Sequence, residues 1–177
     1  MKLEREAKLR VADPAAARRA IETMGARLRR ARHLEDNLLL DDASATLTRS
    51  GSALRLRRAD GRAILTFKGP RREESSGVKV RPEIELEVSD GDGAQALLAA
   101  LGFGPAFRYQ KFREVWDWKD AEIVVDETPL GTFVEVEGPD ETIHEAARAL
   151  GAGPGDYVLE SYPDLFRAAG GRGDMVF

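Results

Sequence analysis

The segment LEREAKL, near the start of the sequence, carries charged residues at the alternate positions Glu4, Glu6 and Lys8. Alternate side chains of a β-strand share one face, so these three would point in the same direction. Glu135 and Glu137 repeat the spacing in FVEVEG. Like charges on one face repel unless water, a basic neighbour or a cation offsets them. Paired carboxylates suit a hard divalent cation such as Mg²⁺.

Basic residues follow the same alternation in the other strand-like segments. In ALRLRR, for example, Arg55 and Arg57 lie opposite two leucines. The whole charged face holds eight basic residues (Lys8, Arg55, Arg57, Lys68, Lys79, Arg81, Lys111, Arg113) and eight acidic ones (Glu4, Glu6, Glu83, Glu85, Glu87, Asp126, Glu135, Glu137). Arginine binds phosphate through a bidentate fork, and lysine as a point charge. Both sets together predict a ligand that combines a polyanion with a metal ion, of which a triphosphate is the simplest.

The segments that must position these side chains are mostly strands. Alternation and turn residues predict eight strands, at 2–11, 27–41, 53–60, 62–69, 79–89, 107–118, 121–128 and 131–138. Asp60-Gly61 is a strong signal for a hairpin turn. Helices are expected at about 14–24, 91–102, 140–150 and 161–168, the first opened by Asp13-Pro14. The fold class is therefore α+β and mainly antiparallel, with one domain over 1–170 and a flexible tail at 171–177.

Each strand alone reads as part of a half-solvated antiparallel sheet, apolar on one face and polar on the other. Two properties of the combined face favour another arrangement. The face carries little Ser, Thr or Asn, and like charges occur together on the same strand. Eight strands are enough to close a barrel. We therefore expect a closed barrel with the charged face inside, a wet and ionic lumen, and short helices covering the apolar outside.

Composition narrows the classes of function. The 177 residues carry a net charge of -4, which argues against a generally basic nucleic-acid binder. The absence of cysteine excludes disulfides and thiolate-bound metals, and two histidines make a zinc site a poor prospect, so any metal would have oxygen ligands. No apolar run reaches membrane-spanning length, and the charged N-terminus does not resemble a signal peptide. A soluble cytoplasmic protein is expected, with no membrane or nucleic-acid partner and an undetermined oligomeric state.

Several blocks resemble the CYTH domain of the triphosphate tunnel metalloenzymes, in the order in which that family has them. They are the ExExK spacing of Glu4, Glu6 and Lys8, then LRLR (54–57), TFKGP (66–70), RPEIELEV (81–88), KFR (111–113), VVDETPLGTFVEVEG (124–138) and SYPDLF (161–166). One departure is that many members carry an aromatic residue soon after an acidic one in the second strand. This chain has Asn37 and Leu38 after Asp36.

The resemblance implies an eight-stranded antiparallel tunnel that binds a triphosphate compound with Mg²⁺ or Mn²⁺. It assigns metal binding to Glu4, Glu6, Glu135 and Glu137, and triphosphate binding to Lys8, Arg55, Arg57, Lys68, Arg81, Lys111 and Arg113. Asp126 matches an acidic position facing the tunnel and joins Glu4, Glu6, Lys8, Glu135 and Glu137 in the expected catalytic set. Glu83 and Glu85 match further acidic positions whose roles the resemblance leaves open.

The leading hypothesis is metal-dependent hydrolysis of a triphosphate. A class IV adenylyl cyclase, which converts ATP to cyclic AMP and pyrophosphate, needs the same tunnel and a nucleoside pocket, for which Phe107, Tyr109, Phe133 and Tyr162 could supply stacking surface. Thiamine triphosphate is a third possible substrate. A non-catalytic binder of polyphosphate, nucleotide or nucleic acid would use the basic runs RLRRARH and KGPRREE. His33 is expected to be a hydrogen-bonded structural residue.

Overall fold

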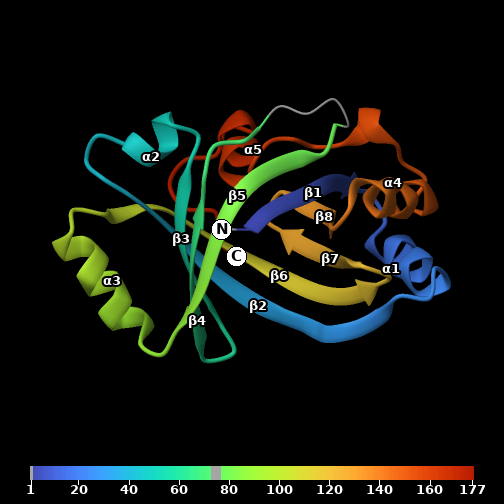
Figure 1. Ribbon diagram of the computed structural model, residues 1–177, viewed down its shortest axis with the longest axis horizontal. Coiled ribbons are helices and arrows are strands. Elements are labelled where there is room, and N and C mark those ends of the chain that lie inside the picture. The colour runs from blue at the N-terminus through green and yellow to red at the C-terminus, as the bar shows by residue number, and fades with distance from the viewer. Residues whose placement is uncertain (1, 73–76) are drawn as a thin grey trace.

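The eight predicted strands are all present and close into one antiparallel barrel (Figure 1). The computed structural model describes residues 2–72 and 77–177. The strands are β1 (Lys2–Val11), β2 (Arg27–Asp41), β3 (Ala53–Ala59), β4 (Arg62–Lys68), β5 (Lys79–Val88), β6 (Gly104–Trp118), β7 (Ala121–Thr128) and β8 (Gly131–Glu137). Around the barrel they follow the order β1-β5-β4-β3-β2-β6-β7-β8, and β8 pairs with β1. The expected fold class is confirmed.

Most neighbouring strands are joined by local hairpins. Asp60 and Gly61, which link β3 to β4, have φ angles of 49° and 75°. Two consecutive positive φ values are typical of a type I′ turn, whose twist matches that of the strands it joins. The exceptions to local pairing are the pair of β2 with β6 and the two pairs made by β1, which lies between two strands distant in sequence. Its residues Lys2 to Glu6 pair with β5, and Glu6 to Val11 pair with β8.

The four expected helices are present, together with two short ones. They are α1 (Pro14–Thr23), α2 (Thr46–Arg49), α3 (Gly91–Ala100), α4 (Asp140–Ala149), a 3₁₀ turn η1 (Pro154–Asp156) and α5 (Tyr162–Ala168). The sequence pattern did not predict α2, which is a single turn. It begins where the buried Asp41 carboxylate accepts main-chain hydrogen bonds from Leu47 and Thr48, both at 2.9 Å. None of the described helices is long and apolar enough to cross a membrane.

The main apolar core lies outside the barrel, between its outer surface and the helices. Ile21 of α1 and Ile143 of α4 are fully buried, as are Ile123 of β7 and Val136 of β8. Trp116 and Trp118 also point outward, and the indole Nε1 of Trp118 donates to the Met24 carbonyl at 3.0 Å. Figure 1 shows α1 and α4 together at one side of the barrel, and α3 at the other. The apolar strand faces therefore point out, which leaves the charged faces to the lumen.

Residues 171–177, expected to form a flexible tail, make specific contacts with β6. The Met175 carbonyl accepts from the Gln110 N–H at 2.8 Å, and the Met175 N–H donates to the Arg108 carbonyl at 3.0 Å. The Met175 side chain is 1% exposed, and the ring of Phe177 lies 5.0 Å from that of Phe112. The glycines of this segment suggested mobility. The sequence pattern did not reveal that its one methionine has a buried position.

Candidate functional site

The lumen of the barrel contains a cavity of about 1070 Å³. Thirteen of the fourteen predicted site residues line it, from the inward faces of β1, β3, β4, β5, β6 and β8. They are Glu4, Glu6, Lys8, Arg55, Arg57, Lys68, Arg81, Glu83, Glu85, Lys111, Arg113, Glu135 and Glu137. The fourteenth, Asp126, faces inward from β7 but is completely buried behind the cavity wall. The alternation of the sequence thus gathers distant charges in one enclosed space.

Four glutamates of β1 and β8 form one side of the lumen, here called the acidic wall: Glu4, Glu6, Glu135 and Glu137. The strand register brings them together, because Glu6 lies opposite Glu137, and Lys8 lies opposite Glu135.

Every carboxylate of the acidic wall has a basic partner. Glu4 pairs with Lys68, Glu6 with Lys79 at 2.5 Å, Glu135 with Arg113 at 2.7 Å and Glu137 with Lys2 at 2.7 Å. Within residues 2–72 and 77–177, no three acidic or histidine side chains are grouped as a metal site. A metal ion would therefore have to displace the lysines before it could bring these glutamates together.

The two buried glutamates of β1 have opposite electrostatic surroundings. Burial, together with the charge of Glu6, raises the pKa of Glu4 to about 7, and Lys68 offsets this only in part. For Glu6, burial is outweighed by Lys79, Lys68 and Lys8, which hold its pKa well below the usual range. The Glu4 Oε2 atom is buried and has no hydrogen-bond partner among the described residues. A crowded carboxylate with an unused oxygen is a donor that suits a hard divalent cation.

The opposite side of the lumen, here called the basic wall, consists of Arg55 and Arg57 of β3 with Lys111 and Arg113 of β6. Asp126 holds the second pair in place from behind. Its carboxylate accepts from Lys111 at 2.8 Å and from the Arg113 guanidinium at 2.6 and 2.5 Å. The Tyr162 hydroxyl of α5 donates to it at 2.9 Å.

Against the effect of burial, Arg113 and Lys111 lower the pKa of Asp126 to about 2. Asp126 was predicted as a catalytic residue that faces the tunnel. In the structure its contacts are to the side chains of the basic wall and to Tyr162, and the cavity does not reach it.

The two arginines of β3 are held more loosely. Arg55 approaches the Tyr109 hydroxyl at 3.5 Å and Thr66 at 3.4 Å, and its Nε has no hydrogen-bond partner among the described residues. Arg57 contacts Glu85 and Glu35, each at 3.4 Å. Hydrogen bonds of this length are weak. Both guanidiniums therefore keep donor capacity for an anion in the cavity.

Two residues differ from their expected positions. Glu35, on β2, is only 2% exposed and lines the cavity, although the sequence analysis did not include it among the site residues. The alternation of His33, Glu35 and Asn37, all buried, was the available signal. Glu87 was assigned to the charged inner face, but its side chain is 61% exposed. It lies near the end of β5, where its side chain leaves the lumen and pairs with Arg62.

Aromatic residues gather near α5, on the lumen side of the strands. Phe107, Tyr109, Phe133 and Tyr162 form a buried cluster with Met175. The Tyr162 ring lies 5.3 Å from Phe133 and 6.1 Å from Tyr109, and the Lys8 ammonium lies 4.2 Å from its centre. The faces proposed for stacking a nucleoside are thus largely occupied by one another and by lysine.

The basic run RLRRARH is neutralised by neighbouring acids. Arg27 pairs with Asp117 at 3.0 Å, Arg30 with Asp60 at 2.5 Å, and Arg32 with Glu127 at 2.8 Å. His33 is hydrogen-bonded, as expected, since its Nδ1–H donates to the Ala31 carbonyl at 2.9 Å, and it is buried. The second basic run, KGPRREE, lies partly outside the described residues.

An antiparallel barrel with acidic and basic walls facing one cavity defines a tunnel protein with a strongly polar interior. The chain belongs to the CYTH domain family, whose model matches residues 2–162. The candidate adenylate cyclase MJ0240 of Methanocaldococcus jannaschii is 28% identical over 167 residues, covering 94% of this chain and 89% of that protein.

Two solved structures share the fold. A candidate adenylate cyclase from Vibrio parahaemolyticus has a TM-score of 0.83 at 21% identity, over 94% of this chain and 98% of that one. A candidate adenylyl cyclase from Hippeastrum, described as having a dominant triphosphatase activity, has a TM-score of 0.70 at 23% identity, over 94% of this chain and 96% of that one.

Proposed function

We propose that the protein is a divalent-metal-dependent hydrolase of triphosphate compounds. The observation that carries this proposal is the opposition of the acidic and basic walls across one cavity. A triphosphate needs both walls, because its negative charge requires arginine and lysine donors while its metal counter-ions require carboxylates. The triphosphatase activity described for the Hippeastrum protein supports the same choice.

The basic wall would bind the phosphate oxygens. Arg55 and Arg57 have weakly used donors facing the cavity, and Asp126 holds Lys111 and Arg113 in fixed orientations. Phosphoryl transfer depends mostly on positioning and charge neutralisation rather than on covalent chemistry by the protein. Donors that are already oriented stabilise the developing charge without reorganisation during the reaction.

The acidic wall would hold Mg²⁺ or Mn²⁺. Glu4, Glu6, Glu135 and Glu137 supply hard oxygen ligands, and the unpartnered buried oxygen of Glu4 fits that role. A bound metal ion supplies Lewis-acid polarisation of phosphoryl oxygens and a more acidic water. Lys68 and Lys79, now paired with Glu4 and Glu6, would turn to the phosphate oxygens as the carboxylates bind the metal.

The alternative is a class IV adenylyl cyclase, and the observation that favours it is the relative from Methanocaldococcus jannaschii, which is named for that activity. Against it, the aromatic rings nearest the cavity pack on one another. Hydrolysis is therefore the first choice, because it requires no nucleoside pocket.

The test is to incubate the purified protein with tripolyphosphate, ATP and thiamine triphosphate, with Mg²⁺, with Mn²⁺ and with a chelator. Metal-dependent release of orthophosphate is the expected result. Cyclic AMP with pyrophosphate would instead identify the cyclase. Binding that needs no metal and gives no product would identify a non-catalytic binder. The Glu135→Gln variant serves as the site control, and full activity in that variant would contradict the assignment.

A further inference from the structure

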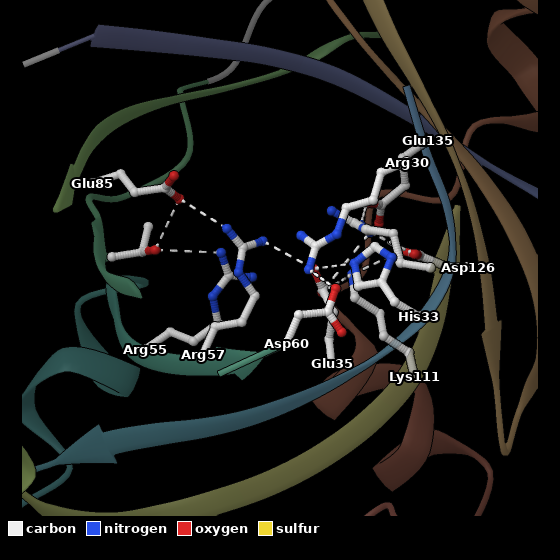
Figure 2. A network of polar contacts seen from close by, with 12 residues as sticks. Arg30, His33, Glu35, Arg55, Arg57, Asp60, Glu85, Lys111, Asp126 and Glu135 are labelled. Carbon is white, nitrogen blue, oxygen red and sulfur yellow. Dashed lines mark hydrogen bonds and ion pairs between the residues drawn. The ribbon is translucent and has the colours of Figure 1, made fainter. Parts of the chain in front are cut away.

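Glu35 is a buried carboxylate inside the basic half of the lumen. It lies on β2 opposite Lys111 of β6, and its side chain is 3% exposed. Three cationic side chains surround it: Arg57 at 3.4 Å, Lys111 at 3.6 Å and Arg113 at 3.9 Å. Figure 2 shows Glu35 between Arg57 on one side and Lys111 and His33 on the other. Glu35 therefore lies among the cations that would bind phosphate.

The contacts of Glu35 are long for a buried charge. No side chain approaches it closer than 3.4 Å in an ion pair, and its Oε2 atom has no hydrogen-bond partner among the described residues. Asp126, by contrast, binds Lys111 and Arg113 at 2.5 to 2.8 Å. Because Asp126 already fixes Lys111 and Arg113, Glu35 is not needed to orient them. Arg57 likewise has a second acidic neighbour in Glu85.

What Glu35 does contribute is negative charge. Arg113 and Lys111, followed by His33 and Arg57, outweigh the effect of burial and hold its pKa well below the usual range, so the carboxylate is ionised at neutral pH. A phosphate group in the cavity would be attracted by the same guanidinium and ammonium groups. Two anions cannot both be fully compensated by one set of cations.

We propose that Glu35 competes with substrate phosphate for Arg57 and its neighbours, and so limits the affinity of the tunnel for phosphate compounds. In the free protein the Glu35 carboxylate neutralises part of the positive charge of the basic wall. When a phosphate binds, the phosphate takes over part of that neutralisation. The same competition assists the departure of a phosphate product. This inference rests on the proposed function, since it assumes that a triphosphate occupies the cavity.

The test measures binding without turnover. Dissociation constants for tripolyphosphate and pyrophosphate are determined by calorimetry at pH 8 in the presence of a chelator, for the wild type and for Glu35→Gln. The substitution keeps the shape of the side chain and removes its charge. We expect both constants to fall about tenfold, because one repulsive charge is lost at close range. Steady-state kinetics should show a lower KM without a matching rise in kcat.

Glu114→Gln is the matched control. Glu114 also lies on β6, is 13% exposed and pairs with Arg18 at 2.9 Å, but it points away from the lumen. Its substitution should change thermal stability and leave both dissociation constants unchanged. If Glu35→Gln does not fold, Glu35→Asp keeps the charge but withdraws it from Arg57, and it should tighten binding about two- to threefold.

The outcomes separate the two claims. Unchanged or weaker binding in the Glu35 variants, with a wild type that binds tripolyphosphate, would overturn the role of Glu35 alone. Failure of the wild type and of every variant to bind under these metal-free conditions would overturn this inference, whereas the proposed function fails only if the wild type also releases no orthophosphate with Mg²⁺ or Mn²⁺. Equal tightening in Glu114→Gln would show a general effect of net charge and would also overturn the specific role.

Discussion

The acidic and basic walls of the lumen differ in how their charges are held. Lys111 and Arg113 of the basic wall are fixed by the fully buried Asp126. In the acidic wall, Glu4 and Glu6 are held by lysines, and Glu137 by a lysine that is 73% exposed. Glu135 alone in this wall is held by an arginine, Arg113. Half of the basic wall, Lys111 and Arg113, is therefore fixed before any ligand arrives, whereas under the proposed function the acidic wall would first have to exchange lysine for metal. Substitutions that weaken the basic wall should therefore mainly lower stability. Substitutions in the acidic wall should mainly lower activity.

The largest effect is expected for Asp126→Asn, which weakens the support of the basic wall. Removing the charge of Asp126 leaves Lys111 with only its longer contact to Glu35, and Arg113 with Glu35 and Glu135. Removing one partner of a buried charge cluster typically costs about 3 to 5 kcal/mol of the free energy of unfolding. Urea denaturation at pH 7 measures the loss. A variant as stable as the wild type would show that Asp126 does not organise this wall.

The lowered pKa of Asp126 also predicts how the free energy of unfolding depends on pH. Its pKa is lowered to about 2 in the folded chain, so its stabilising contribution is complete above roughly pH 4 and is lost as the pH falls through about 2. The wild type should lose about 2 kcal/mol over this range because of Asp126, and the Asn variant should lack that part of the slope. Denaturant titrations from pH 5 to pH 2 compare the two.

Glu137→Gln tests the acidic wall through activity. Glu137 is 34% exposed and pairs with the exposed Lys2, so the free energy of unfolding should change by less than about 1 kcal/mol. Hydrolysis should nevertheless fall at least about 100-fold, because the proposed function makes Glu137 a metal ligand. Glu145→Gln is the control, since Glu145 also pairs with a lysine, Lys119, but lies on α4 outside the barrel. Equal losses in both variants would contradict the assignment.

Glu4→Gln should change the free energy of unfolding in the opposite direction to Asp126→Asn. The pKa of Glu4 is raised to about 7, so its contribution to stability is present below the unfolded value of roughly 4.3 and is lost as the pH rises through 7. In metal-free buffer at pH 8 the neutral glutamine should therefore be more stable than glutamate, by about 3 kcal/mol. At pH 4 the two proteins should be alike. A less stable variant at pH 8 would show that the Lys68 ion pair outweighs crowding.

The smallest effect is expected for Tyr162→Phe. The substitution removes one hydrogen bond to Asp126 while Lys111 and Arg113 keep theirs. A loss of about 1 kcal/mol in the free energy of unfolding is expected, and thermal denaturation measures it. A loss as large as that of Asp126→Asn would mean that the contact with α5, rather than the two cations, holds the carboxylate in place.

The sequence predicts the fold well because one physical signal decides it. Period-two alternation gives the bounds of the strands within a few residues and tells which face is charged. The inverted arrangement follows from the density of charge on that face. Thirteen of the predicted site residues line the lumen for this reason. The exposed Glu87 shows the limit of the signal, since alternation gives the face of a strand but not where the strand leaves the barrel.

The details of the site depend on pairings between strands distant in sequence. Lys79 reaches Glu6 because of the register of β1 on β5. No local pattern in the sequence specifies that register. In EDNLLLD, three successive leucines weaken the alternation, so the polar series of His33, Glu35 and Asn37 is the one signal that Glu35 rather than Asp36 faces inward. The structure buries Glu35 in the lumen and pairs Asp36 with Arg108 outside it.

The position of β1 has a consequence for how the chain reaches its native state. This strand is the first in the sequence, yet its partners β5 and β8 begin at residues 79 and 131. Pairings over such separations form slowly, because a long loop must close before any contact repays its entropy. Half of the acidic wall lies on β1, and Figure 1 shows this strand between β5 and β8. A partly folded or N-terminally clipped chain would therefore lack half of the acidic wall, so ligand binding can report whether folding has finished.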